Sequence, residues 1–331
     1  MQIGVIKQKW IATIGGFDLF IMLLVVFAAP QDSIAAIIGS SILVLTSMTV
    51  ILLYGAVIFL SDGSNDNVNN DVNDLPRDII VTITLLLPYS ALLITRASGI
   101  QQFPIFLVWY LLPAVLLLIQ NRMDSPYRII FVLLAATLLW IGFDHRYTKY
   151  LFEGYSDSYI FNALWMAAVG LSGYSPRIKT ENEFDRGVVP SKQGVKIANI
   201  VTPLASLIVI PFGLLTHFLR WNPQIDVVDI IIGFIGIFLT IALQEELIFR
   251  GIALRELDKF GKTNLSLVVV SALFALTHWN NETPQYVWHY FFAAFIAGIA
   301  YGIAYRKGGL FGAMLSHTLV DWVWAIFLKR V

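Results

Sequence analysis

The sequence predicts an all-α membrane protein, a polytopic transmembrane helical bundle of about ten or eleven spans. Of its 331 residues, 57% are hydrophobic and only 13% are charged, whereas soluble domains are about one-quarter charged. Apolar runs long enough to cross a bilayer recur along the whole chain. The 23 Phe and 9 Trp also suit lipid-facing helices with aromatic rings at the headgroup level.

The candidate spans follow one another with few polar interruptions. They are 10–29, 34–60, 78–95, 101–120, 127–143, 196–219, 227–258, 264–279, 286–305 and 309–328. A further stretch, 158–174, is only marginally long, which leaves the count at ten or eleven. The first run follows two lysines like a signal peptide, but its apolar core is longer than such a peptide needs, so we expect a retained span.

Charge and cysteine content exclude several classes of function. Lys plus Arg is 22 and Asp plus Glu is 22, so no basic excess remains to bind nucleic acid. The absence of Cys excludes disulfide scaffolds, thiolate nucleophiles, zinc ribbons and iron–sulfur clusters. The expected partners are the lipid bilayer and a membrane-associated peptide or protein.

A polar, basic stretch at 172–196 predicts a boundary between an N-terminal region, 1–190, and a C-terminal membrane domain, 191–331. If the N-terminus is cytoplasmic and 158–174 is a span, the loops rich in Lys and Arg lie in the cytoplasm, and we expect an active site reached from the cytoplasmic side. Lys329 and Arg330 fit that orientation less well. The chain shows no internal repeat, which argues against a secondary transporter built on inverted repeats.

Ionisable residues inside a span are costly and usually mark function. The apolar run 227–258 contains Glu245, Glu246 and Arg250. On a helix Glu246 and Arg250 share a face at i,i+4, while Glu245 lies about 100° round the axis. Glu246 can then be ion-paired, leaving Glu245 without a cation and better suited to accept a proton. The pattern is equally compatible with a structural Glu–Arg pair that locks two helices.

Two further helices carry buried histidines. His278 ends the run 264–279, with Phe274 one turn earlier, and His317 lies with Asp321 at i,i+4 in the last run. Glu245 and His278 are each roughly 24 Å from the Gly261 turn at helical rise, and His317 is roughly 12 Å from its own turn. We therefore expect Glu245 and His278 to be level, His317 to be shallower, and the three to share a water-accessible cavity.

These blocks resemble the three ordered motifs of the CPBP family, which contains CAAX prenyl endopeptidases and bacterial Abi-type, bacteriocin-processing and self-immunity proteins. The blocks are Glu245-Glu246-x-x-x-Arg250, Phe274-x-x-x-His278 and His317-x-x-x-Asp321. The resemblance covers about residues 195–331. Asp321 stands where the family has either Asn or Asp.

The resemblance implies an intramembrane endopeptidase that acts on a membrane-associated substrate, either a CAAX-type tail or a peptide precursor. It implies that Glu245 activates water with help from His278. Glu246 and Arg250 would hold the motif helix. His317 and Asp321 would face the scissile carbonyl, with His317 donating to the oxyanion.

The need for a metal is left open by the residues. A zinc-dependent version of the same protease would use Glu245, His278 and His317 as ligands. The H-E-x-x-H arrangement is absent, and Arg250 would oppose a nearby divalent cation, so we expect no cofactor. A catalytically silent membrane scaffold or immunity protein is the remaining alternative.

Overall fold

The computed structural model describes residues 103–121, 123, 126–144, 166, 169–170, 190–259, 261, 264–279 and 283–330. The chain divides into two compact units, Met1–Pro176 and Arg177–Val331, and each is treated by itself. The predicted spans 10–29, 34–60 and 78–95 lie outside the described residues, as does nearly all of 158–174.

The described part of the first unit consists of two apolar helical segments. One runs through α4 (Phe103–Phe106), the π-helical η1 (Leu107–Leu111) and α5 (Leu112–Asn121). The other is α6 (Arg128–Asp144), which packs against α5. These segments correspond to the predicted spans 101–120 and 127–143.

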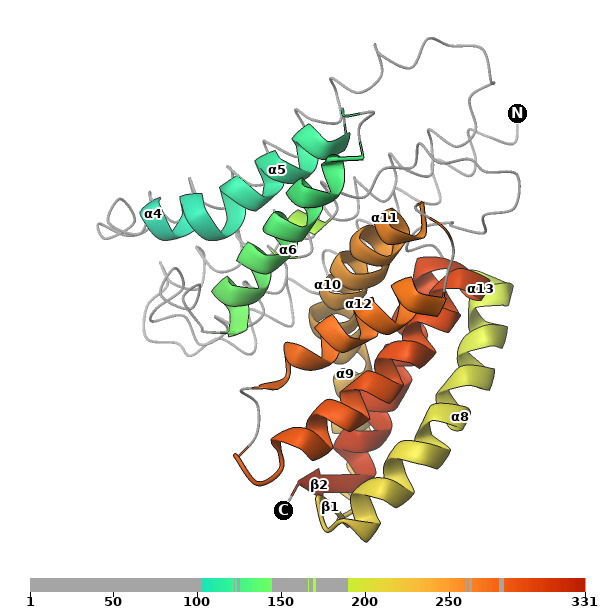
Figure 1. The fold of residues 1–331 in the computed structure, drawn as a ribbon. Coiled ribbons are helices and arrows are strands. Elements are labelled where there is room, and N and C mark those ends of the chain that lie inside the picture. Colours follow the sequence, from blue (N-terminus) through green and yellow to red (C-terminus); the bar gives the residue numbers. More distant parts are fainter. Residues whose placement is uncertain are drawn as a thin grey trace. The chain divides into compact units, whose positions relative to one another are not determined.

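The second unit contains the three motifs, and Figure 1 shows its helices lying side by side. Its elements are α8 (Lys192–Leu215), β1 (Leu219–Trp221), α9 (Val227–Ile237), η3 (Phe238–Ala242), α10 (Leu243–Glu246), η4 (Leu247–Leu254), α11 (Arg255–Asp258), α12 (Asn264–Leu276), α13 (Val287–Phe327) and β2 (Leu328–Arg330). The elements α9 to α11 form one continuous helix with two π-helical stretches, η3 and η4.

Helix α13 folds back on itself at Gly309, where φ is 72° and ψ is −175°. The rings of Tyr301 and His317 stack with their centroids 4.5 Å apart. A straight helix would hold these residues roughly 24 Å apart, so the two sides of Gly309 are antiparallel arms. The arms, 287–308 and 310–327, correspond to the predicted spans 286–305 and 309–328.

The turn between these arms depends on glycine. The dihedral angles of Gly309 lie in a region that residues with a Cβ atom rarely adopt. We expect Gly309→Ala to lower the free energy of unfolding by about 1–3 kcal/mol, measured as a lower unfolding temperature of the purified protein. Gly233→Ala is the matched control, because a Cβ atom there meets open space on a helix. Equal unfolding temperatures for Gly309→Ala and wild type would contradict this account of the turn.

Small residues let the helices of the second unit approach closely. A Cβ atom at Gly298 would lie 3.2 Å from Ser271 of α12, and one at Gly308 would lie 3.0 Å from the Cα atom of Gly194 in α8. Close backbone approach at small residues is the usual means by which membrane helices associate. It brings α8, α12 and both arms of α13 around a common interior.

A two-stranded ribbon departs from the all-α expectation. The helix predicted to reach residue 219 ends at Leu215, and His217 adopts a positive φ of 56° that a helix cannot continue. The chain then forms β1, which pairs antiparallel with β2 in the register Leu219↔Arg330, Arg220↔Lys329 and Trp221↔Leu328. Helix α8 also begins four residues earlier than predicted, because Ser191 caps it by accepting a hydrogen bond from the Gly194 N–H at 2.9 Å.

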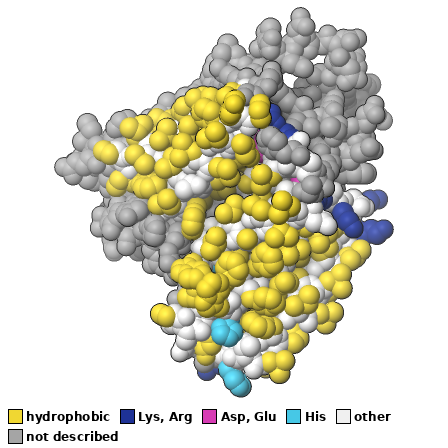
Figure 2. Space-filling view, viewed as in Figure 1, with side chains coloured by type: hydrophobic (Ala, Val, Ile, Leu, Met, Phe, Trp, Pro, Cys, Tyr) yellow, Lys and Arg dark blue, Asp and Glu magenta, His cyan; other side chains and the backbone are white. Residues whose placement is uncertain are grey.

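The described residues contain three continuous helices that are long and apolar enough to cross a membrane: Lys192–Leu215, Ile230–Asp258 and Val287–Phe327. The third is the hairpin of two arms. Hydrophobic side chains cover most of the described surface on the face shown in Figure 2. The chain is therefore an integral membrane protein, while the predicted total of ten or eleven spans is not confirmed.

Candidate active site

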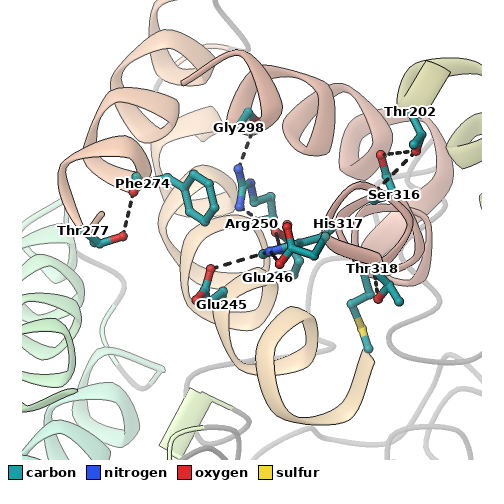
Figure 3. A network of polar contacts seen from close by, with 12 residues as sticks. Thr202, Glu245, Glu246, Arg250, Phe274, Thr277, Gly298, Ser316, His317 and Thr318 are labelled. Carbon is teal, nitrogen blue, oxygen red and sulfur yellow. Dashed lines mark hydrogen bonds and ion pairs between the residues drawn. The ribbon is translucent and has the colours of Figure 1, made fainter. Parts of the chain in front are cut away.

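A buried ion pair stands at the centre of the site (Figure 3). The guanidinium of Arg250 donates from Nη1 to Glu246 Oε1 at 2.8 Å and from Nη2 to the Gly298 carbonyl at 3.0 Å. The Arg250 and Glu246 side chains are 1% and 0% exposed. The guanidinium also packs on the ring of Phe274 at 4.6 Å and on that of Tyr301 at 5.2 Å. The i,i+4 contact expected from the sequence is thus present, and it ties the motif helix to α12 and α13.

His317 is attached to the same carboxylate. Its Nδ1 lies 2.7 Å from Glu246 Oε1 and carries the hydrogen in this bond, because an ionised carboxylate can only accept. Its ring stacks on Tyr301 and meets Phe274 edge-on, with ring centroids 5.8 Å apart. Three contacts therefore fix the orientation of the imidazole and aim Nε2 away from Glu246.

The Nε2 atom of His317 faces two more carboxylates. It lies 3.3 Å from Asp321 Oδ2 and 3.8 Å from Glu245 Oε2. The side chains of Glu245 and Asp321 are 20% and 34% exposed, in contrast to the fully buried Glu246. The two adjacent glutamates thus differ: Glu246 is anchored through Oε1 by two hydrogen bonds, while Glu245 is partly exposed. The Oε2 atom of each is buried without a hydrogen-bond partner among the described residues.

His278 completes the cluster from the end of α12. Its Nδ1 lies 2.9 Å from the Phe274 carbonyl and donates to it, which leaves Nε2 as the acceptor. Its ring is half-buried, 4.8 Å from the Phe274 ring and 5.2 Å from that of Tyr290. His278 is also near enough to Glu245 to interact with its charge. The ring of Phe274 therefore contacts both His278 and His317.

The structure brings together all the residues singled out in the sequence, but at a depth that differs from the expectation. His317 was expected to be shallower than Glu245, whereas it contacts both glutamates. The expected depth assumed α-helical rise throughout. Leu247–Leu254 is π-helical, which shortens this helix between the glutamates and the turn and accounts for part of the expected difference of about 12 Å.

A cavity in the described part of the second unit is not lined by the motif residues. This cavity of about 10 Å³ lies between α8 and the arms of α13, lined by apolar residues such as Val209, Ala297 and Val320. The side chains of Glu245 and Asp321 are nevertheless partly exposed.

Several supporting residues were missed by the sequence analysis. Tyr301 stacks on His317, the Gly298 carbonyl accepts from Arg250, and Thr202 Oγ1 lies 2.9 Å from Ser316 Oγ beside His317. The last contact joins α8 to the second arm of α13. The role of Tyr301 could have been predicted from the small residues around it in the sequence. Small residues let a neighbouring helix approach closely, so an aromatic ring among them packs against that helix.

The candidate zinc ligands do not fit a metal site as they are arranged. Among the residues that the structure describes, no three His, Asp or Glu side chains are grouped so that they could hold a metal ion. The cationic Arg250 is bonded to the Glu246 carboxylate that also accepts from His317, and its positive charge would oppose a divalent cation nearby.

Comparison with known protein families matches residues 227–323 to the family described as type II CAAX prenyl endopeptidase Rce1-like. The matched range includes all three motifs, from Glu245 to Asp321. Comparisons with curated proteins and with solved structures found no match. The family match confirms the resemblance seen in the motifs. Residues 227–323 thus form an Rce1-like domain of the CPBP/CAAX protease family.

Proposed function

We propose that the protein is an intramembrane endopeptidase that hydrolyses a peptide bond in a membrane-associated substrate, either a CAAX-type tail or a peptide precursor. The contrast between the adjacent glutamates carries the proposal. Glu246 is buried and accepts two hydrogen bonds, whereas the Glu245 side chain is 20% exposed and its Oε2 lies 3.8 Å from His317 Nε2. The family match supports the protease class.

The proposed reaction begins with a water held between Glu245 and His278. Glu245 takes a proton from this water as its oxygen attacks the scissile carbonyl carbon. The carbonyl π electrons move to the oxygen, which becomes an oxyanion and accepts a hydrogen bond from His317 Nε2–H. When the C–N bond breaks, the proton held by Glu245 passes to the leaving amine, either directly or through His278. The products are a new carboxylate and a free amine.

Glu246 and Arg250 act as positioning residues in this scheme. Arg250 fixes Glu246, and Glu246 accepts the Nδ1–H of His317, so that the Nε2 atom points toward the accessible side. Asp321, 3.3 Å from Nε2, holds the imidazole until the substrate carbonyl arrives. We further propose a reaction without a cofactor, because the base and the oxyanion donor are both supplied by side chains.

The proposal is tested with purified protein in liposomes, mixed with a prenylated C-a-a-X peptide and with an unprenylated transmembrane peptide. Cleavage in ¹⁸O-labelled water should place the label in the new carboxylate, and a zinc chelator should leave the rate unchanged. A chelator-sensitive rate that zinc restores would favour the zinc-dependent version. Failure to cleave any candidate peptide would favour the silent scaffold.

A further inference from the structure

The ribbon formed by β1 and β2 presents an unusual pair of cations. Arg220 and Lys329 are directly opposite each other in the antiparallel register, and both are exposed. Directly opposite residues share one face of a ribbon, and like charges placed there are destabilising. Neither side chain has an ion pair with any acidic residue that the structure describes. Together with the exposed Arg330, they form what we call the basic ribbon, a surface suited to an anion.

The basic ribbon lies close to the candidate active site. The Arg330 guanidinium carbon is 5.4 Å from the centroid of the Tyr290 ring. The same ring is 5.2 Å from the imidazole of His278. Tyr290 also contacts Trp324 of the second arm, with centroids 6.1 Å apart. One aromatic ring therefore separates a cation of the ribbon from a histidine of the site.

This spacing suits the end of a peptide chain. In a C-a-a-X tail the terminal carboxylate follows the modified cysteine by three residues. Three extended residues span at most about 10–11 Å, so the carboxylate lies within that reach of every peptide bond in the tail. The centroid of the Tyr290 ring is 5.4 Å from the guanidinium carbon of Arg330 and 5.2 Å from the centroid of the His278 ring. Arg330 and His278 are therefore no further apart than the sum of these two distances, which is comparable to the reach of three extended residues.

We propose that the basic ribbon binds the C-terminal carboxylate of the substrate and so selects peptides that end close to the scissile bond. The inference rests on the proposed function, since it requires a peptide at Glu245. It accounts for two observations that the hydrolytic scheme does not use. These are the like-charged pair Arg220 and Lys329, and the two terminal basic residues that fitted poorly with the orientation predicted from the sequence.

The test compares two prenylated C-a-a-X peptides of identical sequence, one with a free C-terminal carboxylate and one with a C-terminal amide. Wild type should cleave the carboxylate peptide with a kcat/KM about tenfold higher, as expected for one charge-assisted contact, and mainly through a lower KM. Arg330→Gln and Lys329→Gln should each bring the ratio toward one by raising the KM of the carboxylate peptide. Lys196→Gln, an exposed charge at the opposite end of α8, is the matched control and should keep the wild-type ratio.

Each outcome separates this inference from the proposed function. Equal cleavage of the two peptides by wild type would overturn the carboxylate site and leave the protease intact. No cleavage of either peptide would overturn both. If the ribbon variants lost affinity for vesicles rich in anionic phospholipid but kept the wild-type ratio, the ribbon would bind lipid headgroups instead. Both substitutions are on the exposed side of the ribbon, and membrane abundance of each variant verifies that it folds.

Discussion

Glu245→Gln should lower peptide cleavage by at least ~100-fold, the lower end of the loss expected for a general base, while the protein stays folded. Glutamine keeps the size and much of the hydrogen bonding of glutamate but cannot accept the proton of the attacking water. The contact of Glu245 with His317 is 3.8 Å long and the side chain is 20% exposed, so little structural support is removed. Initial rates, normalised to the amount of protein in the membrane, measure the effect.

Glu246→Gln is the matched control for this substitution, because it makes the same chemical change one residue away. It weakens the buried contacts with Arg250 and His317, so we expect lower membrane abundance as well as lower activity. A Glu245→Gln protein that cleaved at the wild-type rate would remove Glu245 from the chemistry. If it also complemented a deletion strain as well as wild type while cleavage was lost, the cellular role would not depend on proteolysis.

Arg250→Ala should destabilise the fold strongly. It strands the Glu246 carboxylate and the Gly298 carbonyl in the interior, and loss of one partner of a buried ion pair costs about 3–5 kcal/mol. We expect a much lower unfolding temperature and low abundance in the membrane, with activity lost in proportion or further. Arg250→Lys should recover part of this, because a single ammonium cannot reproduce the planar, two-sided donation.

Lys196→Ala provides the control for Arg250→Ala, since this lysine is exposed at the start of α8. It should leave the unfolding temperature unchanged. Normal abundance of Arg250→Ala together with complete loss of turnover would contradict a positioning role. Arg250 would then have to act directly on the substrate or the reacting atoms.

Local patterns in the sequence predicted a large share of this site. The ion pair of Glu246 and Arg250 follows from helical periodicity alone, since i,i+4 residues share a face in any helix. Glu245 was separated from that pair by the same argument. The grouping of the three motifs could be predicted because isolated ionisable residues in apolar helices are costly and tend to find one another.

Other features depend on contacts that periodicity does not encode. The hydrogen bond from His317 to Glu246 and the stacking of His317 on Tyr301 both require the chain to reverse at Gly309. The packing of the two arms after this reversal is not encoded in helical periodicity. The depth of His317 was predicted wrongly in part because nothing in the sequence of Leu247–Leu254 identifies a π-helix.

The ribbon shows the same limit of local reasoning. Strands of three residues are too short to display an alternating pattern, so β1 and β2 could not be recognised. Lys329 and Arg330 were therefore seen only as charges near the last helix. The pairing of β2 with β1 places them beside Arg220. The resulting basic surface is formed by two segments that are far apart in the sequence.

The account is tested most directly by an experimental structure of the Glu245→Gln protein with an uncleaved prenylated C-a-a-X peptide. The central claim is that the peptide bond is hydrolysed between Glu245 and His317. It predicts the scissile carbonyl oxygen about 2.7–3.1 Å from His317 Nε2, with residue 245 on the side from which water attacks. A peptide bound with its backbone away from His317, or with His317 Nε2 facing the interior, would contradict it.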